Sequence, residues 1–242
     1  MTARVAIVTG GSSGVGEATT KELTGRNWNV AVMSRGKAEI SKALCLQGDV
    51  AQDADCRRVA KSVLDKWGRI DALVNCAGTT KFVKHEDLEG LSADDFLGIL
   101  RVNLVGPFQM IRACAPSLKA GRGSIVNVSS VASILGTGSS IAYAASKAAL
   151  DTMSFSLARA LGPEIRVNIV APGFVKTPWQ VAVHGAAGAD DLERRFAERA
   201  PLKAAAEAGD VAEAIVWLLE GARRVTGEIL YVDAGMHIAS PR

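Results

Sequence analysis

Residues that build metal sites are scarce in this sequence. Its 242 residues include four cysteines and three histidines. The cysteines form no Cys-x-x-Cys pair and match no zinc-binding spacing, and the histidines lie far apart. We therefore expect no metal site. Four reduced thiols are typical of a cytoplasmic protein, and cytoplasmic is the location we expect.

Strong net charge and long apolar runs are also missing. The chain has 28 Lys and Arg residues and 25 Asp and Glu residues, and a net charge of +3 is too small to indicate nucleic-acid binding. No apolar run reaches the length of a membrane span. The N-terminus, MTARVAIVTGG, leads into a strand-like segment and lacks the apolar region of a signal peptide. We expect neither a nucleic-acid partner nor a membrane partner.

Short apolar segments bounded by glycine or polar residues recur along the chain. In order they are RVAIVTGG, NVAVMSRG, LCLQGDV, DALVNCAG, GSIVNVSS, IRVNIVAPG and GEILYVDAG. Nearly continuous apolar runs are typical of parallel strands that helices cover on both faces. Helical segments separate them, so the sequence predicts an α/β fold with a doubly wound (Rossmann) parallel sheet. We expect a single domain over residues 1–242.

The helical segments carry their own start and stop signals. Helices are expected at GVGEATTKELTGR, at DADCRRVAKSVLDKWG, and from Ser92 to about 121 with a kink at Pro107. Two more are expected at IAYAASKAALDTMSFSLARALG and at DVAEAIVWLLEG, the last capped by Asp210. Residues 35–49 leave room only for an abbreviated helix. The stretch 174–209 is irregular apart from an arginine-rich helix in its second half, and it follows a strand at the edge where ligands bind, which predicts a substrate lid.

The segment TGGSSGVG, residues 9–16, lies between the first strand and the first helix. Glycine lets the main chain approach a ligand closely, and the helix N-terminus offers unpaired N–H groups to a pyrophosphate. The segment therefore predicts dinucleotide binding, although an ordinary glycine-rich turn has the same composition. The residues we expect to bind the cofactor here are Gly10, Ser12, Ser13, Gly14, Val15 and Gly16.

The end of the second strand, MSRGK, bears on the type of dinucleotide. An acid there would bind the ribose 2′-hydroxyl of NAD, but this chain has Ser34 followed by Arg35. A guanidinium can pair with the 2′-phosphate of NADP, so NADP(H) is favoured over NAD(H). The alternative is that Arg35 is an exposed loop residue. Asp49, after the next strand, is placed to accept a hydrogen bond from the adenine amino group.

Tyr143 and Lys147 stand four residues apart, so one face of a helix carries both. A nearby ammonium favours the phenolate and lowers a tyrosine pKa from about 10, which suits a general acid or base. Ser130 ends the GSIVNVSS strand at the ligand edge, thirteen residues before Tyr143, where its hydroxyl can hold a substrate oxygen. Alone, the Tyr–Lys pair could be an ordinary helix face; with the serine and the glycine turn it predicts a catalytic site.

The chain resembles the short-chain dehydrogenase/reductase superfamily, of the bacterial type that includes 3-oxoacyl-carrier-protein reductases and tropinone-reductase-like enzymes. The resemblance covers nearly the whole chain. It rests on TGGSSGVG, GDV, NCAG, Asn103 within RVNLVGP, NVSS, YAASK, APGFVKTP and GEILYVDAG, in this order and spacing.

The resemblance implies roles for particular residues. Tyr143 would be the acid/base, Lys147 would bind the nicotinamide ribose and lower the Tyr143 pKa, and Ser130 would orient the substrate oxygen. Asn103 would hold a water that links Lys147 to a proton relay. The further cofactor-binding residues that it implies, beside Tyr143 and Lys147, are Val50, Asn75, Ala77, Gly78, Pro172, Gly173, Val175 and Thr177.

The sequence departs from the family pattern at two single positions. Cys76 stands where NNAG is usual, which puts a side-chain role at that position in doubt; packing as a small apolar residue fits it better than a reactive thiol. Pro163 stands near where carrier-protein reductases have a basic docking residue, which argues against an acyl-carrier-protein substrate.

The predicted activity is hydride transfer between nicotinamide and a ketone or secondary alcohol. Mostly apolar residues would form the substrate pocket: Phe82, Val83, 135–141, Trp179, Val181, Val183 and His184, although a surface loop fits His184 better than a substrate contact does. The alternatives are an NAD-linked dehydrogenase of a sugar, a sterol or another alcohol, and a non-catalytic dinucleotide sensor. The resemblance also implies a homotetramer or homodimer through the helices within 92–119 and 143–161.

Overall fold

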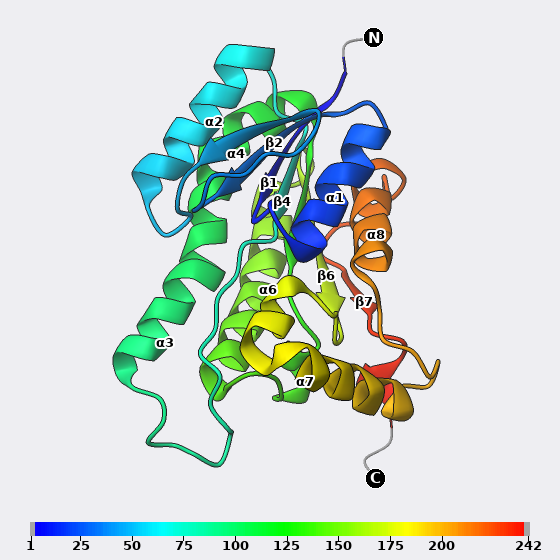
Figure 1. Cartoon of the computed structure of the whole chain (residues 1–242). Helices are drawn as coiled ribbons and strands as arrows, with labels where there is room; N and C mark the ends of the chain where they lie inside the picture. The colour runs from blue at the N-terminus through cyan, green and yellow to red at the C-terminus, as the bar shows by residue number, and fades with distance from the viewer. Residues whose placement is uncertain (1–2, 240–242) are drawn as a thin grey trace.

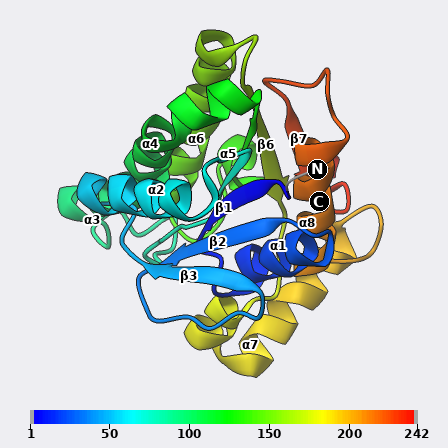
Figure 2. The same cartoon turned by 90° about the horizontal axis from the view of Figure 1, so that it is seen from above.

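One parallel β-sheet forms the centre of the molecule (Figures 1 and 2). The computed structural model describes residues 3–239. Its strands run in the order β3-β2-β1-β4-β5-β6-β7, all parallel. The strands are β1 (Val5–Thr9), β2 (Asn29–Ser34), β3 (Ala43–Gln47), β4 (Ala72–Asn75), β5 (Ser124–Val128), β6 (Arg166–Pro172) and β7 (Ile229–Val232). Every strand that the sequence predicts is present, and the doubly wound α/β fold is confirmed.

Helices cover both faces of this sheet (Figure 2). Side chains alternate along a strand, so Ile7 packs with α2, α4 and α6 on one face, and Val8 packs with α1 and α8 on the other. Both faces of the sheet are therefore shielded from solvent, which explains why the strand sequences are apolar at nearly every position. The helices are α1 (Gly14–Gly25), α2 (Asp53–Trp67), α3 (Ala93–Leu100), α4 (Gly106–Gly121), α5 (Ala132–Leu135), α6 (Ile141–Leu161), α7 (Pro178–Arg199) and α8 (Ala208–Glu220), with a 3₁₀ turn at Met236–Ile238.

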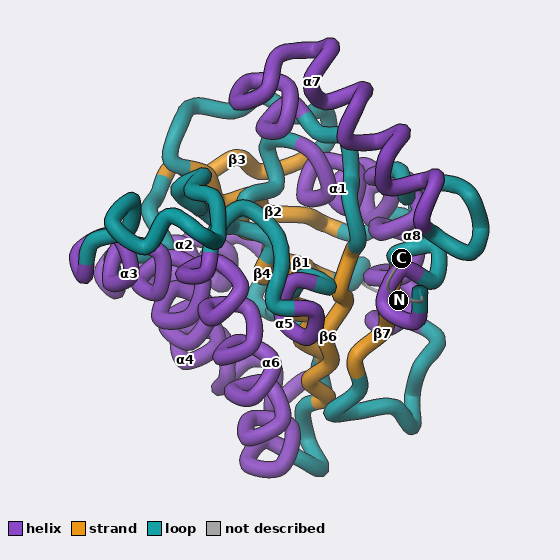
Figure 3. Tube along the Cα trace, turned by 90° about the horizontal axis from the view of Figure 1, so that it is seen from below, coloured by secondary structure: helices purple, strands orange, loops and turns teal. Residues whose placement is uncertain are grey.

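The order of the strands reverses direction between β1 and β4. The chain builds outward from β1 to β3 on one side, then crosses to β4 and builds outward to β7 on the other. Such a switch leaves a crevice at the carboxyl ends of the strands. Figure 3 views that edge, and α7 and the loop after β4 lie beside it.

The long helical region after Ser92 is interrupted before Pro107, as expected. Ser92 and Asp95 form a capping box at the start of α3. A π-helical turn, η1 (Arg101–Val105), then separates α3 from α4, and the amide of Gly106 bonds to the carbonyl of Arg101. Proline has no amide hydrogen to give the carbonyl four residues earlier, here that of Asn103, so the regular ladder breaks at this point.

Three expectations about helices were wrong in detail. Helix α8 starts at Ala208, with Glu207 as its N-cap and Asp210 as the third residue of a capping box. The segment 35–42 contains no helix, because eight residues between β2 and β3 are too few for a helix and its connections. The stretch 174–209 is more regular than expected: α7 fills most of it, broken only at Gly185, whose backbone is left-handed with φ of 70°.

Gly16 sets how closely α1 can pack on the turn that precedes it. A Cβ atom built on Gly16 would overlap the carbonyl oxygen of Gly10, which is backbone and cannot rotate away. Gly25, at the other end of the same helix, has nothing within 4 Å of such a Cβ. The two glycines therefore differ in packing while they share one helix.

We predict opposite effects of alanine at these two positions. Gly16→Ala should lower the free energy of unfolding by about 2 kcal/mol or more, because the added methyl forces the turn and the helix apart. Gly25→Ala should raise it by roughly 0.5–1 kcal/mol, because the unfolded chain loses freedom. Urea unfolding followed by circular dichroism measures both. Equal stability of the two variants would contradict the packing role of Gly16.

Candidate active site

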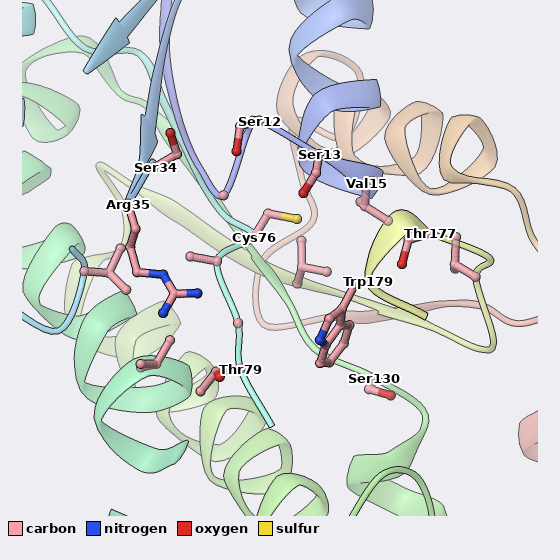
Figure 4. A pocket seen from close by; sticks show the side chains of 18 of the residues that line it. Ser12, Ser13, Val15, Ser34, Arg35, Cys76, Thr79, Ser130, Thr177 and Trp179 are labelled. Atoms are coloured by element: carbon pink, nitrogen blue, oxygen red, sulfur yellow. The ribbon is translucent and has the colours of Figure 1, made fainter. Parts of the chain in front are cut away.

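A cleft of about 500 Å³ lies at the carboxyl edge of the sheet (Figure 4). Most of the residues that the sequence singled out line it. They are Gly10, Ser12, Ser13, Gly14, Val15, Ser34, Arg35, Asp49, Val50, Ala77, Gly78, Ser130, Tyr143, Lys147, Pro172, Gly173, Val175 and Thr177. Residues from the ends of six strands, β1 to β6, thus meet in one cavity, although they are spread over most of the chain.

The glycine turn brings two strand ends into contact. Gly10 has a left-handed backbone with φ of 66°, and a Cβ there would lie 2.9 Å from the main chain of Ala77. The Thr9 hydroxyl accepts hydrogen bonds from the amides of Cys76 (3.1 Å) and Ala77 (3.2 Å). The first turn of α1 therefore starts at the cleft, beside the end of β4.

The N-terminus of α1 faces this cleft without a side-chain cap. Ser13 is the N-cap residue, and its side chain makes no capping hydrogen bond. The first amides of a helix have no partner within the helix and carry the positive end of its dipole. Because the hydroxyls of Ser12 and Ser13 point the same way in Figure 4, this end of the cleft suits an anion such as a pyrophosphate.

Arg35 brings a cationic side chain to the cleft. Its carbonyl accepts a hydrogen bond from Gln47 Nε2 at 2.9 Å, and the Ser34 hydroxyl donates to the Gly36 carbonyl at 2.9 Å, so the loop is well held. Across residues 3–239, no carboxylate pairs with the Arg35 guanidinium, which extends into the cavity in Figure 4. The group is free to bind an anion.

Helix α6 carries Tyr143 and Lys147 and begins at the cap residue Ser140, whose hydroxyl accepts the Tyr143 amide at 3.3 Å. Lys147 is buried, with 5% of its surface exposed. Its Nζ donates to the Val128 carbonyl at 2.8 Å and lies 5.7 Å from the centre of the Tyr143 ring. This bond fastens α6 to the end of β5, next to Ser130.

Burial dominates the acid–base properties of this pair. Desolvation raises the pKa of Tyr143 to about 12, opposed by its interaction with the Ser130 hydroxyl. Desolvation lowers the pKa of Lys147 to about 8, although Cys76 and the buried Asp151 one turn along α6 act in the opposite direction. The expected lowering of the Tyr143 pKa by Lys147 is therefore wrong for this structure: burial of the phenol is the largest cause of its shift, and the interaction that opposes it comes from Ser130.

Asn103 does not line the cleft, contrary to a direct role for its side chain. It is 1% exposed, and its Oδ1 accepts the Thr79 amide at 2.8 Å. Its Nδ2 donates to the Thr79 carbonyl and to Ser146 Oγ, each at 2.9 Å. Both amide hydrogens are thus used in fastening the loop after β4 to α6. The side chain positions that loop and has no hydrogen left to hold a water.

Two predicted cofactor-binding residues also lie outside the cavity. Asn75 is 2% exposed, and its Nδ2 donates to Asn127 Oδ1 at 2.8 Å. The Nδ2 of Asn127 in turn donates to Ser154 Oγ at 2.8 Å. This chain of bonds runs under the sheet edge towards α6, so Asn75 supports the site from behind. Gly16 acts through the packing of α1, as described above.

The cavity also contains residues that the sequence did not single out as cofactor-binding. All are next to a strand end or on a helix that faces one, which was the signal available for finding them. They are Met33, Gly36, Gly48, Thr79, Val102, Val128, Ser129 and Gln180. Cys76 lines the cleft as well, and burial raises the pKa of its thiol to about 11, so it stays protonated at neutral pH.

Three of the residues expected around a substrate are in contact with one another. The Phe82 ring lies 5.8 Å from that of Trp179 and 4.9 Å from that of His184, centre to centre. Phe82 follows β4, while Trp179 and His184 belong to α7. His184 is thus on a helix and against an aromatic ring, instead of in a surface loop.

Within residues 3–239, no group of three or more His, Cys, Asp or Glu side chains is arranged to hold a metal ion. None of the helices in that range combines the length and apolarity that a membrane crossing requires.

Comparison with known proteins identifies the family. The family described as enoyl-(acyl carrier protein) reductase matches residues 10–237. The chain belongs to the short-chain dehydrogenase/reductase family. A Streptomyces violaceoruber protein named for a ketoacyl reductase of the granaticin polyketide synthase is similar to this family member, with 37% identity over 98% of this chain and 97% of its own length.

Other short-chain dehydrogenase/reductases show the same likeness. The 3-oxoacyl-(acyl-carrier-protein) reductase of Bos taurus is 34% identical over 97% of this chain and 98% of its own. The solved structure of a ligand-free aldohexose dehydrogenase from Thermoplasma acidophilum has a TM-score of 0.93 at 28% identity, covering 100% of this chain and 96% of that one. This chain is therefore an oxidoreductase of the family, with ketoreductases among its relatives.

Proposed function

We propose that this protein is an NADP(H)-dependent ketone reductase that works in reverse as a secondary-alcohol dehydrogenase. One observation carries the proposal: Ser130, Tyr143 and Lys147 line the same cleft as the glycine turn and Arg35. A general acid, a group that holds an oxygen, and a dinucleotide cradle thus share one cavity.

The cleft fits a dinucleotide in both shape and charge. The missing Cβ at Gly10 and the uncapped start of α1 leave room and donors for a pyrophosphate. The unpaired Arg35 guanidinium matches the 2′-phosphate of NADP, and no acid at position 34 would repel it. Lys147 lines the same cleft and would bind the nicotinamide ribose, and Thr177, which lies against Gly14, would bind the carboxamide.

A nicotinamide bound in this cleft would supply a hydride to the carbonyl carbon of the substrate. Ser130 and Tyr143 hold the carbonyl oxygen, and Tyr143 gives its hydroxyl proton to that oxygen as charge develops there. A pKa raised by burial keeps Tyr143 protonated, so the free enzyme is set as an acid for reduction. The Lys147 ammonium stabilises the phenolate that forms.

The π-helical turn η1 contains a main-chain carbonyl that can bind a water molecule of the proton relay. Pro107 has no amide hydrogen for the Asn103 carbonyl, and the Asn103 side chain is occupied by Thr79 and Ser146. We therefore assign the expected water to the main-chain carbonyl of Asn103, because its side chain is already bonded to Thr79 and Ser146. A water there would connect Lys147 with solvent and return the proton to Tyr143.

The substrate and the assembly are part of the same proposal. Relatives named as ketoacyl reductases favour a ketone, whereas the aldohexose dehydrogenase keeps an NAD-linked sugar dehydrogenase as the second candidate. We also propose a cytoplasmic homo-oligomer. Val105 and Phe108, each 43% exposed, give the η1–α4 segment an apolar outer face that a second copy would cover.

Replacing Tyr143 by Phe should abolish turnover and spare cofactor binding. The chain has two tyrosines, so Tyr231→Phe, which removes a half-buried hydroxyl from β7, is a matched control. Loss of a general acid should lower kcat by about 10²–10⁴-fold. Steady-state reduction of a ketone panel and NADPH titration by fluorescence measure the two properties. Full activity of Tyr143→Phe would disprove the assignment.

Replacing Arg35 by Ala should affect NADPH far more than NADH. Because a hydrogen bond to a charged group contributes roughly 1.5–3 kcal/mol, we expect KM for NADPH to rise about 10- to 100-fold. KM for NADH should stay unchanged, which makes it the internal control. Initial rates with each cofactor decide the matter, and a wild-type enzyme that prefers NADH would support the sugar dehydrogenase instead.

The free enzyme should bind NADPH less efficiently when the pH is above the pKa of Lys147. That pKa is lowered to about 8, so the ammonium is present at neutral pH and is lost as the pH rises through this value. We expect kcat/KM for NADPH, which reports groups of the free enzyme, to be flat near neutrality and to fall above pH about 8. Re-assay at neutral pH after each incubation controls for unfolding. A profile flat to pH about 10 would show that Lys147 titrates at its ordinary value.

A further inference from the structure

An aromatic cluster borders the cleft through Trp179, the member of the cluster that lines the cavity. Phe82 lies between Trp179, at an interplanar angle of 59°, and His184, edge-on at 89°. These tilted and edge-to-face arrangements are the favourable ones for aromatic pairs. The three rings, called the aromatic cluster below, join the loop after β4 to the first turns of α7.

The loop that carries Phe82 is itself held in place. The Val83 amide donates to the Ser139 carbonyl at 2.9 Å, and the hydroxyls of Thr80 and Ser139 are 2.7 Å apart. Asn103 fastens Thr79, at the start of the same loop, to α6. Phe82 is therefore a fixed support, and the first part of α7 rests on it as far as the break at Gly185.

Trp179 lines the cleft together with Ser130, Tyr143 and Lys147, and it is 42% exposed. In Figure 4 its indole extends from α7 towards Ser130. An exposed indole gains free energy when a ligand covers it, and the ring of Phe82 contacts this indole from one side.

Two lysines near the aromatic cluster in sequence already have carboxylate partners. Lys81, next to Phe82, pairs with Asp95 at 2.8 Å. Lys176, three residues before Trp179, pairs with Asp190 and with Glu193. These carboxylates compete with an anionic group of a substrate for the two lysines.

We propose that Trp179, braced by Phe82, is the platform on which a planar unsaturated ring of the substrate stacks. The substrate class is then a ketone fused to or conjugated with an aromatic ring, with its oxygen on Ser130 and Tyr143. This assignment rests on the proposed ketone reductase. A flat ring gains orientation as well as burial from an indole face, whereas a linear acyl chain gains burial alone.

The test compares two cyclic ketones that differ only by a fused benzene ring, α-tetralone and cyclohexanone. The wild-type enzyme with NADPH should have the higher kcat/KM for α-tetralone. Trp179→Ala should raise KM for α-tetralone about tenfold and leave that for cyclohexanone within about threefold, since stacking is lost for one ketone alone. Trp179→Phe, which keeps a ring, should restore most of the preference.

Trp217→Ala is the matched control, because Trp217 is 51% exposed on α8, away from the cleft. It should change neither KM. Unaltered NADPH binding and unfolding midpoint would show that Trp179→Ala is folded. An equal fall in kcat/KM for both ketones in Trp179→Ala, or a wild-type preference for cyclohexanone, would overturn the platform.

Binding separates this inference from the proposed function. Should the wild-type enzyme reduce no ketone, the proposed function fails, and calorimetric binding of α-tetralone to wild type and to Trp179→Ala still decides the platform. About tenfold weaker binding by the variant supports stacking on Trp179. Equal binding by the two proteins, or no binding by wild type, overturns it.

Discussion

Parallel pairing of every strand is the constraint on which the rest of this structure depends. Parallel strands in register end at the same edge of the sheet, so residues far apart in the chain meet there without any loop having to reach them. The glycine turn after β1, Arg35 after β2, Ser130 after β5 and Thr177 after β6 all share one cavity for this reason. The site is a product of topology before it is a product of any single contact.

A small set of buried polar groups then holds the edge in shape. Asn75, Asn127 and Ser154 form one chain of hydrogen bonds. The side chain of Asn103 bonds to the main-chain amide and the main-chain carbonyl of Thr79. Buried polar groups are destabilising unless they are paired, so these networks specify one arrangement of β4, β5 and α6. They lie behind the cleft and leave its surface to Tyr143, Lys147 and the glycine turn.

Burial also decides the chemistry available to the two central residues. Water excluded from α6 raises the pKa of Tyr143 and lowers that of Lys147, so each neutral form is favoured over its charged form. The Val128 carbonyl accepts a hydrogen bond from the Lys147 ammonium, and the charge of Asp151 favours its protonated form. In the aromatic cluster, by contrast, the Trp179 side chain is only partly buried, and we propose that a ligand covers it.

The sequence by itself determined the strands, most helices and the residues at the strand ends, because these depend on local patterns. Alternation of side chains, apolar runs between glycines, and the fixed spacing of Tyr143 and Lys147 can all be recognised along the chain. The confirmed sheet and the membership of the family follow from them.

Only the tertiary structure decided which of those residues reach the cleft and how they titrate. Gly16, Asn75 and Asn103 carry family motifs yet support the cavity from behind, because their packing partners come from other elements. The pKa of Tyr143 depends on how much water the fold removes, and the contact of Phe82 with Trp179 joins segments almost a hundred residues apart. Desolvation and long-range contact are properties of the folded chain, and no local pattern encodes them.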